Sequence, residues 1–159
     1  MENLVEVKNL KKNYGSKEAV KGISFNIKEN EILGLLGPNG SGKTTTIGMM
    51  LGLLKPSNGE ILIDGKKIEE NRIETLQKIN FISPYIELPK KLTVKQNLVV
   101  YCKLYNVSDI KNRIEYLVEK LRLEDLLNRV TGELSSGQKN RASLAKALIN
   151  SPSVLFLDE

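Results

Sequence analysis

The sequence predicts an α/β fold, and two observations support this prediction. Near the N-terminus apolar and polar residues alternate, as in an antiparallel sheet with one face in water, whereas later apolar runs are continuous, as in strands covered on both faces. A mainly helical stretch lies between the first continuous run and the last one. We therefore expect an α/β core that carries an antiparallel β portion and an inserted helical portion.

The antiparallel portion is expected from short segments that alternate or that pair through a turn. These segments are residues 4–7, 19–27, 60–63 and 66–68. Gly15 and Ser16 mark the turn between the first two segments. Asp64 and Gly65 give the last two the signature of a hairpin with a type I′ turn. The remaining expected strands are residues 32–36, 79–82 and 154–157, of which the first and the last are apolar without alternation.

The helices are expected from apolar residues at three- and four-residue spacing. They begin at Lys43, after Thr93, at residue 110 and after Ser135. The first carries apolar side chains as far as Leu54, and residues 56–59 end it. The second begins with a capping box formed by Thr93 and Gln96.

The stretch between the expected strand at 32–36 and the first helix has the spacing of a phosphate-binding loop. It fits the pattern G-x-x-x-x-G-K-[ST] with Gly37, Pro38, Asn39, Gly40, Ser41, Gly42, Lys43 and Thr44. Glycines allow successive backbone N–H groups to curl around an anion, and the following helix directs its positive end there. Lys43 adds a charge that reaches the β- and γ-phosphates, and Thr44 offers a hydroxyl to Mg²⁺. The pattern predicts a nucleoside triphosphate site.

Two carboxylates, Asp158 and Glu159, follow the apolar run at residues 154–157. The carboxyl ends of parallel strands share the sheet edge at which ligands bind. We therefore expect Asp158 to hold Mg²⁺ and Glu159 to orient a hydrolytic water. The alternative is a strand that is followed by an ordinary polar loop.

A second candidate anion site lies at residues 134–138. Ser135 and Gln138 have the spacing of a capping box, which needs no chemistry. A turn of Ser136 and Gly137 at a helix N-terminus is also suited to a second phosphate group. Both interpretations can hold together, and spacing does not choose between them.

The composition excludes several classes of protein. The chain has no histidine, which excludes histidine-based catalysis and most zinc sites. Its single Cys102 cannot form an internal disulfide and favours a reducing cytosol. We expect neither a signal peptide nor a membrane span, because no apolar stretch approaches the roughly 20 residues that a span needs. The net charge of +5 comes from scattered basic residues interleaved with acids, so we expect no nucleic-acid binding.

Taken in order, the stretch from Gly37 to Thr45, residues 134–138 and residues 154–159 resemble the ATP-binding cassette (ABC) family. The likeness covers essentially the whole chain. It implies a P-loop NTPase core of RecA-like type, here incomplete at the C-terminus, with an antiparallel β portion and an inserted helical subdomain. It implies a single domain over residues 1–159. Its parts are a β portion with the phosphate-loop core (1–84), a helical subdomain (85–134), and the signature helix with the last core strand (135–159).

The resemblance also implies roles for individual residues. ATP and Mg²⁺ are the expected cofactors, the nucleotide-binding stretch extends through Thr45, and Tyr14 is expected to stack on adenine. Lys43 and Glu159 are the expected catalytic residues. Two such domains dimerise head to tail, so that one domain's signature turn contacts the ATP of the other. The signature residues are Ser135, Ser136, Gly137 and Gln138.

Three features depart from the family pattern. Pro84 stands where relatives carry a glutamine that contacts Mg²⁺ and the attacking water, with Ser83 or Tyr85 as possible substitutes. Ser136 stands where glycine is usual. Relatives also continue past the position of Glu159, to a strand that ends in a histidine.

The sequence as a whole is most similar to those of ATPase subunits of ABC-2-type exporters. This implies an ATP-hydrolysing subunit that drives export through a transmembrane permease by ATP-dependent dimerisation with a second ABC domain, identical or different. It would be cytoplasmic, peripheral at the inner face of the cell membrane. Two alternatives stay open: a non-transport ABC protein associated with ribosomes or DNA, and a nucleotide-binding remnant with little turnover.

Overall fold

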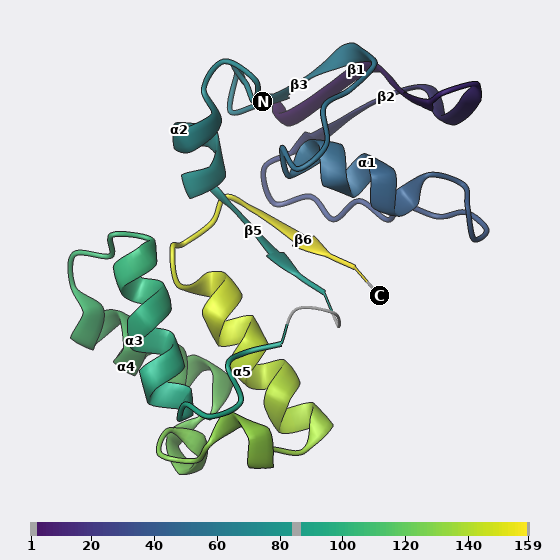
Figure 1. Cartoon of the computed structure of the whole chain (residues 1–159). Helices are drawn as coiled ribbons and strands as arrows, with labels where there is room; N and C mark the ends of the chain where they lie inside the picture. The colour runs from purple at the N-terminus through teal and green to yellow at the C-terminus, as the bar shows by residue number, and fades with distance from the viewer. Residues whose placement is uncertain (1–2, 84–86, 159) are drawn as a thin grey trace. The chain divides into compact units, whose positions relative to one another are not determined.

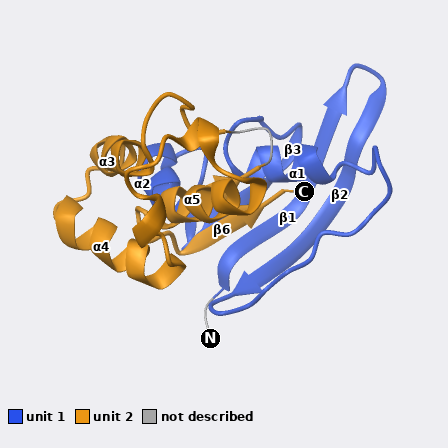
Figure 2. Ribbon diagram, turned by 90° about the horizontal axis from the view of Figure 1, so that it is seen from below, with its two compact units in different colours: residues 1–79 blue, residues 80–159 orange. Residues whose placement is uncertain are grey.

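The computed structural model describes residues 3–83 and 87–158 of the chain, which forms two compact units (Figures 1 and 2). Unit 1 comprises residues 1–79 and unit 2 comprises residues 80–159. Each unit has its own secondary structure and its own buried side chains.

Unit 1 contains a four-stranded antiparallel sheet in the order β2-β1-β3-β4. Its strands are β1 (Asn3–Tyr14), β2 (Lys17–Lys28), β3 (Asn58–Ile63) and β4 (Lys66–Lys67). Asp64 and Gly65 both have positive φ, 52° and 71°, as the expected type I′ turn between β3 and β4 requires. The sequence prediction of an antiparallel β portion is therefore confirmed.

The apolar core of unit 1 lies between this sheet and the helix α1 (Lys43–Met50). The strands contribute side chains that alternate along β1 and β3, and α1 adds Met49 and Met50. The buried strand residues are Val5, Val7, Leu10, Val20, Ile61 and Ile63. The helix is shorter than the sequence predicts, because Gly52 adopts φ +64° directly after the cap and ends it before Leu54.

The predicted buried strand at residues 32–36 is wrong. Residues 31–38 form neither helix nor strand, and Ile32 and Leu36 are 98% and 93% exposed. A continuous apolar run shows that a segment can be buried on both of its faces. To form a strand, the segment also needs neighbouring backbones with which to exchange hydrogen bonds. Within the described part of the chain, no sheet includes this segment.

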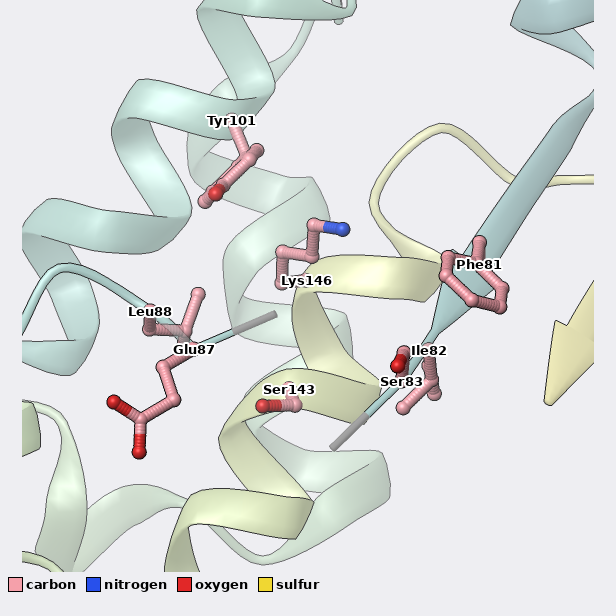
Figure 3. A pocket seen from close by; sticks show the side chains of 8 residues that line it. All are labelled: Phe81, Ile82, Ser83, Glu87, Leu88, Tyr101, Ser143 and Lys146. Atoms are coloured by element: carbon pink, nitrogen blue, oxygen red, sulfur yellow. The ribbon is translucent and has the colours of Figure 1, made fainter. Parts of the chain in front are cut away.

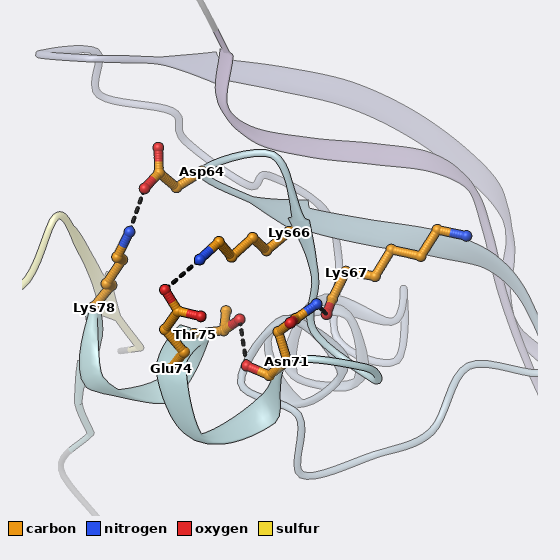
Figure 4. Close-up of polar contacts among 7 residues, drawn as sticks. All are labelled: Asp64, Lys66, Lys67, Asn71, Glu74, Thr75 and Lys78. Atoms are coloured by element: carbon orange, nitrogen blue, oxygen red, sulfur yellow. Dashed lines mark hydrogen bonds and ion pairs between the residues drawn. The ribbon is translucent and has the colours of Figure 1, made fainter.

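Ion pairs tie a short helix of unit 1, α2 (Arg72–Gln77), to the β3–β4 hairpin (Figure 4). Lys66 pairs with Glu74, and Lys78 pairs with Asp64. The hydrogen bond from Lys78 lowers the pKa of the Asp64 carboxyl, and Lys66 lowers that of Glu74 in the same way. All four side chains reach solvent, so these contacts orient the helix more than they stabilise the fold.

Unit 2 combines a two-stranded sheet with three helices. The sheet pairs β5 (Ile79–Ile82) with β6 (Val154–Leu157), and the two arrows run in the same direction in Figure 1. The helices are α3 (Val94–Leu104), α4 (Ile110–Leu121) and α5 (Ser136–Leu148), with 3-10 turns at Glu124–Leu126 and Thr131–Glu133. These elements occur where the sequence predicts strands and helices. Leu157, however, is 66% exposed, so the last strand is not covered on both faces along its whole length.

The core of unit 2 is the apolar cluster between its three helices. Its most deeply buried members are Val94, Leu98, Cys102, Leu117, Leu123, Ala142, Ala145 and Ile149. Burial raises the pKa of the Cys102 thiol, which therefore stays protonated and packs as a small apolar side chain. The apolar stripes on these helices are core positions, as their spacing predicts. None of the helices within the described residues has the length and apolarity that a membrane span requires.

A buried polar cluster joins the segment before α3 to the segment before α5. The amide Nδ2 of Asn97, fully buried, donates to the carbonyl oxygens of Pro89 at 3.2 Å and Thr93 at 3.1 Å. The hydroxyl of buried Thr131 donates to the Pro89 carbonyl at 2.7 Å. Within the described residues Asn97 Oδ1 has no hydrogen-bond partner. The cluster fixes the chain four residues before Ser135.

Candidate nucleotide-binding site

The predicted phosphate loop is an exposed turn at the N-terminus of α1. Residues 37–40 are exposed, and the Ser41 amide donates to the Pro38 carbonyl at 3.1 Å, which closes the turn. The Lys43 ammonium bends back into it and donates to the carbonyl oxygens of Gly37 at 2.6 Å and Pro38 at 3.1 Å. The loop therefore surrounds the Lys43 ammonium, and a phosphate group can replace these carbonyls as its hydrogen-bond acceptor.

The helix that follows this loop presents its N-terminus without a side-chain cap. Gly42 is the N-cap residue, and no side chain accepts a hydrogen bond from the first turn. N–H groups of a first turn have no partner inside their helix, and the helix dipole adds positive potential there. Thr44 is exposed in this turn, Thr45 is half-buried, and Thr46 is buried. The hydroxyl of Thr44 is thus accessible to a cation, and the turn suits an anion.

Gly42 holds this helix start against strand β2. Its φ is +93°, and a Cβ built on it would lie 2.4 Å from the Ala19 carbonyl oxygen and 3.1 Å from Cγ2 of Val20. A side chain is therefore excluded by both backbone conformation and space. The glycine that the pattern requires for phosphate binding also sets the distance between the loop and the sheet.

Tyr14 lies in the same unit, at the end of β1, and its side chain is 50% exposed. The Lys12 ammonium lies over its ring, 5.2 Å from the ring centroid. An exposed aromatic face at a fixed strand end can accept a stacking base. The contact between Lys12 and Tyr14 was not predicted from the sequence, although two residues of the same strand separated by one position share a face.

The signature residues lie at the start of α5 in unit 2. The Ser135 amide donates to Gln138 Oε1 at 2.9 Å, and the Gln138 amide donates to Ser135 Oγ at 3.4 Å. This capping box is the structural interpretation that the sequence left open. Ser136 and Gly137 are exposed beside it. The box leaves the anion-binding interpretation open as well, because the exposed turn keeps its helix N-terminus facing solvent.

Asp158 follows β6, where the sequence expects a metal-binding carboxylate. Its amide donates to the Ile82 carbonyl at 3.0 Å, so the pairing of β5 and β6 extends to this residue, and its side chain is half-buried. Glu159, Pro84 and Tyr85 lie outside the described residues, and Ser83 is buried. Within the described chain, no three side chains of Asp, Glu or Cys gather as a ready-made metal centre. The Asp158 carboxylate in unit 2 and the Thr44 hydroxyl in unit 1 are each chemically suited to Mg²⁺.

A separate small pocket lies in unit 2 (Figure 3). Phe81, Tyr101, Ser143 and Lys146 contribute to its lining, and its volume of about 10 Å³ leaves room for about one water molecule. Burial lowers the pKa of the Lys146 ammonium, which lies 5.2 Å from the centre of the Tyr101 ring. The pocket is far too small for a nucleotide, whose sites take up hundreds of cubic ångströms.

Fold and loop together define a mixed α/β protein of the P-loop class, with the phosphate loop in unit 1 and the carboxylate and signature turn in unit 2. A family model described as "ABC transporter" matches residues 20–159. The chain belongs to the ABC transporter family.

Individual relatives agree with this assignment. The chain is 40% identical over 157 residues to Nod factor export ATP-binding protein I of Burkholderia orbicola, covering 98% of this chain and 52% of that protein. It is 38% identical over 162 residues to bacitracin transport ATP-binding protein BcrA of Bacillus licheniformis, covering 100% of this chain and 52% of that protein. The chain thus spans about half the length of these curated relatives.

Solved structures of the family have the same fold. An ATP-binding subunit of an ABC transporter superposes with a TM-score of 0.87 at 28% identity, over 98% of this chain and 66% of that one. CbiO1 from Clostridium perfringens, described as part of the ABC transporter complex cbiONQ, superposes with a TM-score of 0.86 at 33% identity, over 100% of this chain and 66% of that one. The predicted fold class, a P-loop NTPase core with a β portion and a helical portion, is confirmed.

Proposed function

We propose that this chain binds ATP as part of an ATPase subunit that powers export through a transmembrane permease. The observation that carries the proposal is the Lys43 ammonium, which donates to the Gly37 and Pro38 carbonyls inside an exposed loop at the N-terminus of α1. The names of the relatives support the direction of transport, since one is an export protein and another serves bacitracin transport. These names give no support to a role on ribosomes or DNA.

In this proposal the phosphate loop provides most of the binding free energy. The triphosphate displaces the two loop carbonyls from Lys43, whose charge then neutralises the β- and γ-phosphates. Backbone N–H groups of residues 40–45 donate to the same phosphates. Mg²⁺, when bound, compensates the phosphate charge, with Thr44 and Asp158 as its protein ligands.

Hydrolysis is assigned to Glu159 together with Lys43. Glu159 orients the attacking water and accepts its proton, while Lys43 stabilises the negative charge on the γ-phosphate. We further propose that Ser135, Ser136, Gly137 and Gln138 contact the ATP of a second ABC domain, which makes ATP binding favour dimerisation. Units 1 and 2 would then be parts of one ATPase domain, held at the inner face of the membrane by its permease.

ATP titration by calorimetry tests the proposal. Lys43→Ala should weaken ATP binding about 10- to 100-fold, since it removes a charged hydrogen-bond donor to the phosphates, worth about 1.5–3 kcal/mol. Lys28→Ala removes an exposed lysine of the same unit, at the end of β2, and should leave affinity unchanged. Equal affinities of the parent chain and Lys43→Ala would refute the assignment of the loop.

A further inference from the structure

We propose that Lys12 is a positioning residue for the base of the bound nucleotide: its ammonium covers one face of the Tyr14 ring and leaves the opposite face for the base. This inference rests on the proposed function, because it requires a nucleotide whose phosphates occupy the loop at residues 37–45. It adds a residue that belongs to neither the phosphate loop nor the signature turn.

The ammonium group of Lys12 lies against the Tyr14 ring. Lys12 Nζ lies over the Tyr14 ring, 5.2 Å from its centroid, and donates to the Lys55 carbonyl oxygen at 2.7 Å. The carbonyl and the ring hold the cation from two sides, so the lysine is half-buried while Tyr14 remains 50% exposed. A cation at this distance is attracted to the face of an aromatic ring, and it restricts the rotation of that ring.

The backbone that carries both residues is fixed by hydrogen bonds. The Asn13 amide donates to Ser57 Oγ at 3.0 Å, and the Ser57 amide donates to the Lys11 carbonyl at 2.8 Å. With the Lys12 contact to Lys55, three hydrogen bonds fasten this strand end to the segment between α1 and β3. A ring on a fixed strand and under a fixed cation is preorganised for stacking, so a base need not immobilise it on binding.

Within unit 1, the path from this ring to the phosphate loop is short. Lys12 is opposite Val20 in the β1–β2 register, and Gly42 packs against Ala19 and Val20. Adjacent strands are about 5 Å apart, and two residues along a strand cover about 7 Å. One nucleotide can therefore have its phosphates at the loop and its base at the Tyr14 ring, which is 50% exposed.

The consequence is a contribution that is specific to the base. Loss of the cation should weaken ATP binding about 2- to 10-fold, the range expected when one side chain has to be immobilised on binding. The binding of inorganic tripolyphosphate, which has no base, should stay unchanged. Lys12→Arg should keep ATP affinity, since a guanidinium also stacks on an aromatic face.

A double-mutant cycle on the full chain tests this inference, with calorimetric titration of ATP and of tripolyphosphate. The variants are Lys12→Met, Tyr14→Ala and their combination, and Lys21→Met is the control that removes one positive charge from the neighbouring strand. We expect Lys12→Met to weaken ATP binding in the parent chain and to have no further effect in the Tyr14→Ala background. Lys21→Met should leave both ligands unaffected.

Two results would overturn the inference while the proposed function stands. One is an equal loss of ATP and tripolyphosphate affinity in Lys12→Met, which would make Lys12 a general phosphate attractor. The other is an undiminished effect of Lys12→Met when Tyr14 is already alanine. ATP binding that does not depend on Lys43 would instead refute the proposed function and this inference with it.

Discussion

Replacement of Gly42 by alanine tests the packing of the phosphate loop on the sheet. The substitution introduces two separate penalties. A side chain at φ +93° is strained, which costs about 1–2 kcal/mol. The new Cβ would also lie 2.4 Å from the Ala19 carbonyl oxygen, a backbone atom that cannot rotate away. Overpacking of this kind typically costs about 1–3 kcal/mol, so the sum is about 2–5 kcal/mol.

Gly40 provides the matched control for this prediction. Its φ of +82° is similar, but a Cβ there would meet no atom within 4 Å. Gly40→Ala should therefore show the backbone penalty of about 1–2 kcal/mol without the packing penalty. Any gain from a stiffer unfolded chain is the same for both variants and cancels in the comparison.

The assay is urea unfolding followed by far-ultraviolet circular dichroism, with the free energy of unfolding compared among the parent chain, Gly42→Ala and Gly40→Ala. We expect Gly42→Ala to lose about 1–3 kcal/mol more than Gly40→Ala. Equal losses in the two variants would show that the close approach of Gly42 to Ala19 does not exist in solution, and the reasoning would fail.

Further predictions concern the buried polar cluster, the ion pairs and the hydrolytic residue. Asn97→Ala should lower the free energy of unfolding by about 2–3 kcal/mol, because it removes two buried hydrogen bonds and leaves a cavity; an unchanged urea midpoint would contradict this. The pKa of Asp64, followed by NMR, should lie below its ordinary value of 3.8 and should rise in Lys78→Met, which removes the hydrogen bond that lowers it most. Because that pKa is lowered in the folded state, the stabilising effect of Asp64 is present above the unfolded pKa and is lost as the pH falls through the folded one. Glu159→Gln, in the whole native polypeptide that contains this sequence, should slow phosphate release by roughly 10²–10⁴-fold and spare ATP binding; normal turnover would refute its assigned role.

Local sequence signals predicted most of the secondary structure. The capping boxes at Thr93 and Ser135 are both present, because a side chain that bonds to the backbone three residues away needs no distant partner. The turn at Asp64 and Gly65 is set in the same way by the conformational preferences of two residues. Features with local causes could therefore be predicted from the sequence.

Features that depend on residues far apart in the sequence could not be predicted from it. The apolar run at residues 32–36 gives no information on which backbone would pair with it, and the structure leaves Ile32 and Leu36 exposed. The burial of Asn97 depends on Pro89 and Thr131, which lie on either side of α3 and α4. Its position between Val94 and Leu98 on an apolar helix face was the available signal, since a polar residue there needs buried partners.

In the candidate site, too, features with local causes were predictable from the sequence and features with distant causes were not. The loop pattern identified the glycines and Lys43 as site residues. The contacts of Lys43 with the Gly37 and Pro38 carbonyls could be found only in the structure. The hydrogen bond from the Lys12 ammonium to the Lys55 carbonyl joins residues more than forty positions apart, which no spacing rule reveals.

The most direct test of the central claim is to map Mg-ATP on the ¹⁵N-labelled chain by NMR. We expect the largest shift changes at the amides of residues 37–45 and smaller ones at the strand end that carries Tyr14, and we expect Lys43→Ala to abolish both. Changes concentrated around Lys146 and Tyr101, or no changes at millimolar nucleotide, would contradict the assignment of this loop as an ATP site.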